Sequence, residues 1–338
     1  MRRIPGLKRE TWGPGSGAEA FGSPNGVHGI PGLKRETWGT RNPAESRSNL
    51  AENALEVPDL LIDSHAHLDS ERYADDREAM LRRAWEAGVG TVLAIGIGEQ
   101  AAGMDGALAV CRQFNGRPES GVGIPRLYAS AGVYPHNTPE IDDAVLAKLD
   151  TLLAEPEVIA CGEIGLDYYH EGAPHEVQRA GLIRQLEIAA ARKRPILIHC
   201  RPQEGSTDAW DELLEILEEH WRPTGLGGVM HCFGGGWDQA RRSLDLGFLL
   251  SFAGNLTYAK AQPLRDVAAL VPLDWVLVET DAPWLAPAPN RGKRNEPAWV
   301  AQTALVLAGL LGVNEQEIAA ATTKNFLRLF RLGANVGN

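Results

Sequence analysis

The sequence contains few cysteines and no closely spaced pair of them. Its 338 residues include only four, at positions 111, 161, 200 and 232. This spacing excludes a disulfide-stapled scaffold and a zinc ribbon, and it is typical of free thiols in a reducing compartment. No apolar run approaches the roughly 20 residues that a membrane-spanning helix needs, and the basic N-terminus lacks the apolar core of a secretory signal. We therefore expect a cytoplasmic protein that does not contact a membrane.

Basic side chains are the minority among the charged residues. Lys and Arg number 33 against 44 Asp and Glu, which gives a net charge of −11. Nonspecific binding to nucleic acid relies on Lys and Arg that face the phosphates. The composition therefore excludes that mode for the surface as a whole, although it leaves room for a local basic cleft. The length and the hydrophobic share of 44% are sufficient for a sizeable buried core.

The first 57 residues differ from the rest, because they are rich in Gly, Pro, Arg, Asn and Ser and poor in apolar clusters. They contain a direct repeat, IPGLKRETWG, at 4–13 and again at 30–39. Two short copies cannot stack into a solenoid, which needs at least about three repeats. We interpret residues 1–57 as a disordered or mis-annotated leader upstream of the true start. The alternative is a short binding peptide that carries Trp12 and Trp38.

From residue 58 to residue 332 short apolar runs alternate with amphipathic stretches, and a tail of 333–338 follows. The runs are 60–67, 91–98, 127–135, 158–167, 195–200, 229–235, 248–254 and 275–283. Near-continuous Val, Ile and Leu is typical of parallel strands that are covered on both faces. Helical patterns lie between them at 175–193, 207–220 and 238–247. Eight such units predict a TIM (β/α)8 barrel, with a doubly wound sheet as the alternative.

Six residues of metal-ligand type interrupt or end these runs. They are His65, His67, Glu163, His199, His231 and Asp281. We expect each to lie at the carboxyl end of its strand, where the loops of a barrel form the active site. In an extended strand residues i and i+2 point to the same side, so His65 and His67 can both face the barrel mouth. Each residue alone has an ordinary structural explanation, but six at one end of five strands predict two divalent metal ions, Zn²⁺, Mn²⁺ or Mg²⁺, with a bridging carboxylate.

From about Pro58 to Leu332 the chain resembles the TatD family of metal-dependent hydrolases, members of the amidohydrolase-like barrel superfamily. The motifs that carry the resemblance are DSHAHLD (63–69), GEIGLDYY (162–169), ILIHCR (196–201), MHCFGG (230–235), VETDAPWLAP (278–287), GKRNEP (292–297) and TTKNFLRLF (322–330). The resemblance implies a deoxyribonuclease with 3′→5′ exonuclease activity, and it implies a ligand set for each metal ion: His65, His67 and Asp281 for one, His199 and His231 for the other, and Glu163 between them. By the same resemblance Asp281 orients or deprotonates the attacking water, so Asp281 and Glu163 are the expected catalytic residues.

One motif departs from the family pattern. At AGVYPHN (131–137) the family usually has Gly-x-His-Pro-His, and here Tyr134 replaces the first histidine while His136 keeps the second. A tyrosine can donate a hydrogen bond to a phosphate but carries no positive charge. The expected substrate contacts are therefore His136, Tyr134 and Arg201, together with Trp284, which can stack on a base.

Other polar residues receive weaker interpretations. Arg291, Lys293 and Arg294 follow the last strand and are candidates for phosphate contacts, with a solvated loop as the alternative. Asp167 is either a partner that orients a ligand or a turn residue. No role is assigned to His28, His170, His175 and His220.

The preferred hypothesis is a metal-dependent nuclease that acts on the 3′ ends of single-stranded DNA through a water activated by two metal ions. Its partner is then the DNA substrate, with no obligate protein partner. One alternative is hydrolysis of a small ester, amide or lactone at the same site, because barrels of this class support many hydrolyses. Another is a non-catalytic binding protein on the same barrel.

Overall fold

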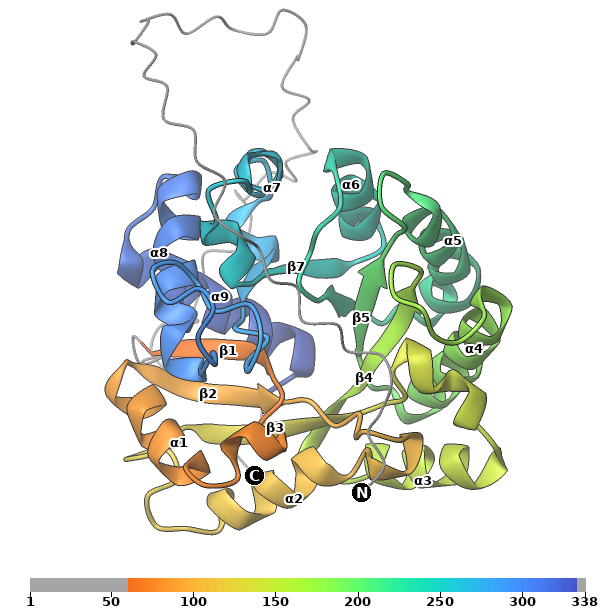
Figure 1. Ribbon diagram of the computed structural model, residues 1–338, viewed down its shortest axis with the longest axis horizontal. Coiled ribbons are helices and arrows are strands. Elements are labelled where there is room, and N and C mark those ends of the chain that lie inside the picture. Colours follow the sequence, from red (N-terminus) through yellow and green to blue (C-terminus); the bar gives the residue numbers. More distant parts are fainter. Residues whose placement is uncertain (1–59, 333–338) are drawn as a thin grey trace, which may run out of the picture. The chain divides into compact units, whose positions relative to one another are not determined.

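The computed structural model of the chain describes residues 60–332. The predictions made for residues 1–57 and 333–338 lie outside the described residues. Eight strands form one all-parallel sheet in which each strand pairs with the next in sequence (Figure 1). The strands are β1 (Leu61–Ala66), β2 (Val89–Ala94), β3 (Arg126–Ala131), β4 (Val158–Asp167), β5 (Ile196–Arg201), β6 (Gly228–Met230), β7 (Phe248–Phe252) and β8 (Val276–Val278).

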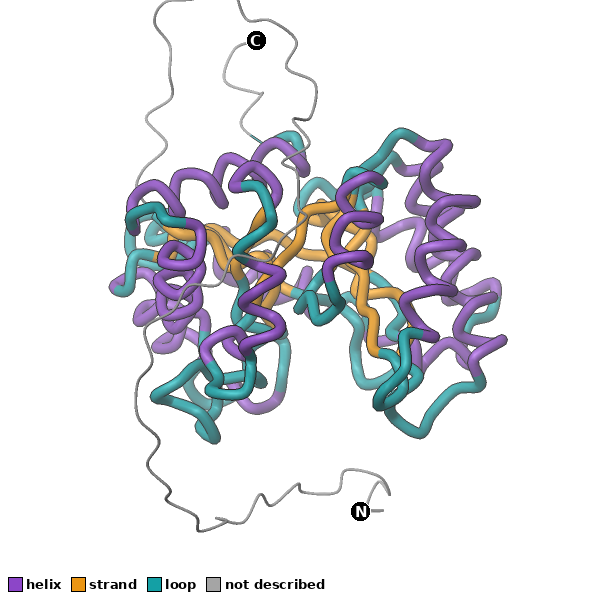
Figure 2. Tube along the Cα trace, turned by 90° about the horizontal axis from the view of Figure 1, so that it is seen from above, coloured by secondary structure: helices purple, strands orange, loops and turns teal. Residues whose placement is uncertain are grey.

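The sequential strand order confirms the predicted barrel and excludes the doubly wound alternative, in which the order reverses part-way. The ring closes where Ala66 and Ala282 form a parallel bridge. Within the described residues the α-helices are α1 (Arg77–Glu86), α2 (Gly106–Asn115), α3 (Asp143–Leu153), α4 (His175–Arg192), α5 (Asp208–Ile216), α6 (Trp237–Asp245), α7 (Gln262–Ala268), α8 (Val300–Leu311) and α9 (Glu315–Phe330). They flank the strands on the outside (Figure 2).

The three predicted helices are present with small boundary changes. The helix expected at 207–220 ends earlier as an α-helix, because Leu217–Trp221 continues it as a π-helical turn. The helix expected at 238–247 begins at Trp237 and stops before Gly247, whose φ of +84° cannot continue a helix. Among residues 60–332 no single helix is long and apolar enough to cross a membrane; Pro297–Leu311 and Glu315–Phe330 meet that criterion only as a pair bent by 104°.

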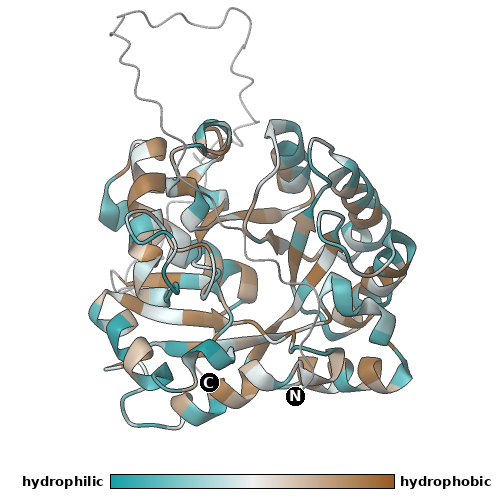
Figure 3. Ribbon diagram, in the orientation of Figure 1, coloured by the Kyte–Doolittle hydropathy of each residue, from teal (hydrophilic) through white to brown (hydrophobic). Residues whose placement is uncertain are grey.

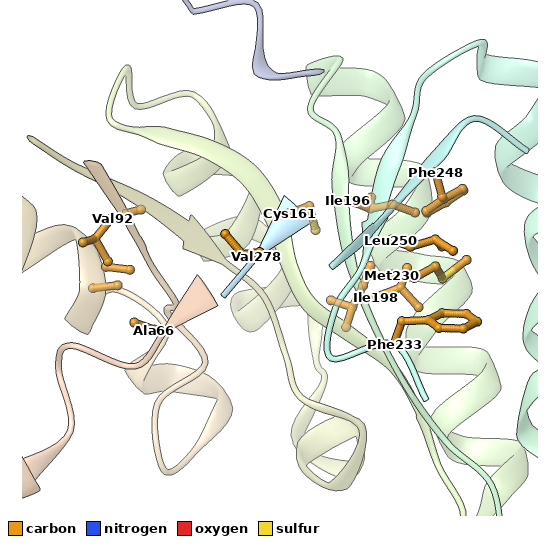
Figure 4. Close-up of a cluster of buried hydrophobic side chains, with 14 of the residues drawn as sticks. Ala66, Val92, Cys161, Ile196, Ile198, Met230, Phe233, Phe248, Leu250 and Val278 are labelled. Atoms are coloured by element: carbon orange, nitrogen blue, oxygen red, sulfur yellow. The ribbon is translucent and has the colours of Figure 1, made fainter. Parts of the chain in front are cut away.

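The core has two parts, and side-chain alternation along the strands separates them. One cluster joins residues from strands on opposite sides of the ring, so it fills the barrel interior: Ile62, Leu93, Ile95, Ile159, Ala160, Leu197, Val229, Leu249, Leu277, Phe326 and Phe330. The last two come from α9. The larger cluster lies between the strands and the helices (Figure 4). Hydropathy follows the same division, with hydrophobic residues along the strands and hydrophilic residues on the outward parts of the helices (Figure 3).

The seam between the first and last strands fixes the register of residues at the barrel mouth. The Asp281 N–H donates to the His65 carbonyl at 2.9 Å, and the His67 N–H donates to the Ala282 carbonyl at 2.8 Å. Just below, the buried Asp63 carboxylate accepts hydrogen bonds from the Thr280 N–H at 2.9 Å and the Thr280 hydroxyl at 2.5 Å. Barrel closure therefore sets the two histidines of β1 against Asp281, although more than 200 residues separate them in sequence.

Candidate metal centre

Four ligand-type atoms converge at the seam. His65 Nε2 lies 3.4 Å from His67 Nε2 and 3.4 Å from Glu163 Oε2. Asp281 Oδ1 lies 3.4 Å from His67 Nε2 and 3.7 Å from His65 Nε2. Four ligands at bonds of about 2.1 Å around one tetrahedral Zn²⁺ are separated by roughly 3.4 Å, from the geometry of the tetrahedron. The spacing of these four atoms fits a single cation.

A second group meets the first through the other oxygen of the same carboxylate. Glu163 Oε1 lies 2.9 Å from His199 Nδ1 and 3.3 Å from His231 Nε2. The two oxygens of Glu163 thus face different pairs of imidazoles. That is the arrangement expected of a carboxylate that bridges two metal ions.

The centre is buried and its carboxylates are ionised. Glu163 is 2% exposed and His65 is 1% exposed. Burial raises the pKa of Glu163, but the charge of His231 and hydrogen bonds from the surrounding imidazoles outweigh burial and hold this pKa well below its usual value. Burial likewise raises the pKa of Asp281, and its hydrogen bond to His67 with the neighbouring imidazole charges brings that pKa below the usual value. The four imidazoles and two ionised carboxylates of this centre form a donor set that suits divalent cations. Binding of such a cation displaces protons from the imidazoles.

The expectation that every ligand candidate stands at a strand end is wrong for Glu163. It lies inside β4, four residues before the end of that strand. The β4–β5 register shifts between Cys161 and Ile164, and such an irregularity re-aims the side chain between them. Gly165 permits the close approach of the two strands here, since a Cβ at this position would lie 1.9 Å from the His199 carbonyl oxygen.

Asp281 lies three residues beyond β8 and has a φ of +54°. This left-handed conformation is uncommon outside glycine, although Asp and Asn adopt it more readily than other residues. It occurs at the residue whose carboxylate faces both β1 histidines, which is where strain at a functional site is expected.

One residue that the sequence analysis did not identify is Glu279, which is fully buried. Its Oε1 lies 2.8 Å from His231 Nδ1 and accepts a hydrogen bond from the Cys232 N–H at 2.6 Å. A carboxylate on the outer nitrogen of a ligand histidine fixes the ring orientation and raises its basicity. Its signal in the sequence was its place two residues before Asp281. Asp167, predicted as an orienting residue or a turn residue, is placed similarly, with Oδ2 at 3.3 Å from His199 Nε2.

The role of Glu279 is testable by substitution. Glu279→Ala is expected to weaken Zn²⁺ binding by about 10–100-fold, because the His231 ring loses the partner that orients it. Competition against a chromophoric chelator measures the affinity. Glu279→Gln should recover part of the loss, and Glu219→Ala, at a largely exposed position, should bind as the unmodified chain does. Equal affinity in Glu279→Ala and Glu219→Ala would show that Glu279 does not support the site.

The predicted substrate contacts lie around the rim of the centre. Tyr134 donates a hydrogen bond to Asp167 Oδ2 at 3.2 Å, and its hydroxyl lies 3.3 Å from His199 Nε2. His136 lies beside them, with Nε2 at 3.4 Å from the same Asp167 oxygen. Trp284 is 45% exposed, and its ring meets His67 edge-on at 4.9 Å between centroids.

Three arginines near the mouth behave differently from one another. Arg201 stacks on Tyr169, with 4.1 Å from its Cζ to the ring centre. Arg291 stacks on Tyr258 in the same way, with 4.5 Å from its Cζ to the ring centre. Arg294 instead binds both carboxylate oxygens of Asp76 at 2.8 and 2.6 Å. The structure therefore gives Arg294 an intramolecular partner where the sequence analysis offered a phosphate.

The two cysteines that follow ligand candidates, Cys200 and Cys232, are partly buried free thiols. Burial raises the pKa of Cys200 and of Cys232 well above the usual value. A thiol that stays protonated is a poor nucleophile. Their side chains therefore contribute to packing rather than to nucleophilic chemistry.

Comparison with known proteins finds matches over almost the whole described region. The profile of a family described as TatD related DNase matches residues 62–331. The chain is 39% identical over 278 residues to the uncharacterized metal-dependent hydrolase YcfH of Escherichia coli K12, covering 81% of this chain and 97% of that protein. It is 32% identical over 279 residues to a protein of Erwinia billingiae named 3′-5′ ssDNA/RNA exonuclease TatD, covering 81% and 100%. A crystal structure of YJJV, a TatD homolog from Escherichia coli K12, matches with a TM-score of 0.71 at 33% identity, covering 80% of this chain and 98% of that one.

Proposed function

This chain belongs to the TatD family of metal-dependent hydrolases, and from that premise we propose that it is a nuclease that removes nucleotides from the 3′ end of single-stranded DNA. The observation that carries the proposal is the carboxylate of Glu163, whose two oxygens face two separate sets of ligand atoms. We assign His65, His67 and Asp281 to one divalent ion, His199 and His231 to a second, and Glu163 to both. When bound, two such metal ions would polarise a phosphoryl oxygen and lower the pKa of a bound water.

Asp281 and Glu163 have different roles in the proposed reaction. Asp281 is 16% exposed at its side chain, the most open of the assigned ligands of the first ion, so its carboxylate can meet an attacking water. Its ionised state allows it to orient this water and to accept its proton. Glu163 is buried beneath and keeps the two groups of imidazoles at a fixed spacing. We infer that Asp281 acts as the base and Glu163 as the shared ligand.

The choice of nucleic acid as substrate rests on the relatives and on the aromatic rim. The Erwinia relative is named as an ssDNA/RNA exonuclease. On this chain Trp284 and Tyr169 are 45% and 40% exposed beside the centre, and Arg201 stacks on Tyr169. Exposed aromatic rings stack on unpaired bases regardless of sequence. Basic groups at this rim supply locally the positive charge that a chain of net charge −11 lacks overall. We also place the enzyme in the cytosol, since its four cysteines are free thiols.

The direct test is degradation of single-stranded DNA that carries a fluorophore at the 5′ end. With Mg²⁺ or Mn²⁺ present we expect a ladder of products that shorten progressively from the 3′ end. Phosphorothioate linkages at the 3′ end should slow the ladder, and the same linkages at the 5′ end should not. Intact DNA after incubation with folded, metal-loaded protein would overturn the substrate assignment. Turnover of a small ester, amide or lactone by that same preparation would support the alternative hydrolase, judged by relative kcat/KM.

Substitution of Trp284 distinguishes the binding of a nucleic acid from the hydrolysis step. We expect Trp284→Ala to raise KM for single-stranded DNA by roughly 5–150-fold, since stacking contributes about 1–3 kcal/mol per base, while kcat changes little. Steady-state kinetics on the labelled oligonucleotide measure both constants. Trp284→Phe keeps a stacking ring and should retain most of the affinity. An unchanged KM in Trp284→Ala would show that no base stacks there.

A further inference from the structure

A third cluster of ligand-type side chains lies beside the metal centre, on the outer side of His199. Asp167 Oδ2 lies 2.8 Å from His170 Nδ1 and 3.4 Å from His136 Nε2. One ligand atom from each of these three residues lies within 4.8 Å of the others. His170, to which the sequence analysis assigned no role, is thereby joined to a residue that contacts the metal centre.

Hydrogen bonding alone does not account for this convergence. The same Asp167 oxygen also lies 3.2 Å from the Tyr134 hydroxyl and 3.3 Å from His199 Nε2. Four polar groups thus surround an oxygen that offers about two lone pairs. Both ring nitrogens of His136 are buried and have no hydrogen-bond partner. Leaving a buried polar atom unpaired costs about 1–3 kcal/mol, so a further partner bound at His136 would stabilise the arrangement.

The His136 ring packs closely against Gly172. A Cβ at Gly172 would lie 1.8 Å from His136 Nδ1, so only glycine fits there. The Gly172 backbone covers the Nδ1 edge of the ring. The Nε2 edge is then the one that can bind a partner, and it faces Asp167.

The chemistry of the cluster favours a cation. Asp167 is fully buried, and its Oδ2 faces the imidazoles of His136, His199 and His170. A carboxylate at the middle of the cluster is a ligand for a cation and disfavours an anion such as phosphate. Two imidazoles and one carboxylate are a common ligand set for Zn²⁺. The 3.4 Å between His136 Nε2 and Asp167 Oδ2 matches the roughly 3.4 Å between ligands of a tetrahedral ion, whereas His170 Nδ1, at 2.8 Å from the same oxygen, would have to move outward by a few tenths of an ångström. The side chain of His170 is 51% exposed, which leaves an open side for entry and for water ligands.

We propose that His136, Asp167 and His170 form a third divalent-cation site that binds Zn²⁺ separately from the dinuclear centre. Asp167 links the two, because one oxygen contacts both this cluster and the outer nitrogen of His199. A cation here places positive charge on the side of the centre where Tyr134 offers only a neutral hydroxyl. That use in holding a substrate phosphate, unlike the binding itself, rests on the proposed nuclease function.

Counting bound Zn²⁺ tests the site without reference to catalysis. The full chain, stripped of metal with a chelator, is equilibrated with Zn²⁺ by dialysis, and bound metal is measured by elemental analysis. We expect the double variant His136→Ala and His170→Ala to bind one equivalent fewer than the unmodified chain. The matched control is His220→Ala, a partly exposed histidine far along the chain from the cluster, which should keep the full number. A Co²⁺ titration should show the same difference as the loss of one set of visible absorption bands.

Several outcomes decide the proposal. Equal stoichiometry in the double variant and the unmodified chain overturns it, and so does an equal loss in His220→Ala. Binding of inorganic phosphate that depends on His170, without loss of Zn²⁺, also overturns it in favour of an anion site. If the double variant does not fold, His170→Ala alone decides, because its half-exposed side chain is not part of the core. Three equivalents of Zn²⁺ with untouched DNA would refute the nuclease and leave this site standing, whereas DNA cleavage with only two equivalents would do the reverse.

Discussion

Glu163→Gln is expected to reduce bound metal from two equivalents at the dinuclear centre to one or fewer, and to lower hydrolysis of single-stranded DNA by about 10³-fold or more. The amide keeps the shape of the carboxylate but replaces one of its two acceptor oxygens with an N–H donor. In the structure Oε2 faces His65 and His67 while Oε1 faces His199 and His231. Either orientation of the amide therefore turns a donor towards one group of ligands. Elemental analysis of dialysed protein gives the metal content.

A matched substitution separates this loss from a general effect of removing a glutamate. Glu212→Gln removes a carboxylate of similar size that pairs with Arg179 on the outside of the barrel. It should retain both equivalents and full activity. Should Glu163→Gln retain two tightly bound ions, the bridging role would be wrong, and the two groups of ligands would be independent sites.

Asp281→Asn is expected to lower kcat by roughly 10³-fold, in the range of a lost general base, with little change in KM. Asparagine tolerates the left-handed backbone at this position about as well as aspartate does. Its carbonyl oxygen can still approach the two β1 histidine sites, but a neutral amide cannot accept the proton of the attacking water. Single-turnover kinetics at saturating metal separate this chemical loss from weakened metal binding.

Two control variants test whether Asp281 acts both as a metal ligand and as the base. Asp281→Ala should lose metal affinity as well as rate, because it removes the ligand altogether and places a less tolerant residue at a positive φ. Asp274→Asn, at an exposed aspartate before β8, should have no effect on either constant. If kcat in Asp281→Asn stays within a few-fold of the value for the unmodified chain, a group other than Asp281 accepts the proton of the attacking water.

Much of the candidate centre could be predicted from two simple periodicities, the alternation of side chains along a strand and the repeat of apolar runs along the chain. Alternation along a strand places His65 and His67 on one side, and their Nε2 atoms are 3.4 Å apart. The rhythm of eight apolar runs gives the barrel, and parallel strands bring their carboxyl ends together. Both inferences use only the local sequence and the geometry common to all chains.

Other features depend on contacts between distant segments and left weak signals or none. Glu163 reaches the centre from inside β4 through an irregular register with β5. Glu279 lies behind His231 although 47 residues separate Glu279 from the neighbouring Cys232 that it also binds. His170 lies only three residues after Asp167, but the sequence did not show that His136, from another strand–helix unit, meets both of them.

The sequence by itself therefore determined the fold class and the candidate ligand residues, because hydrophobic periodicity and strand alternation are local properties. The tertiary structure alone decided which oxygen of Glu163 faces which histidines, which carboxylates stand behind the imidazoles, and that Arg294 binds Asp76. It also decided that His136, Asp167 and His170 meet. These are matters of register, burial and side-chain direction, and a few ångströms of displacement between distant strands would change each of them.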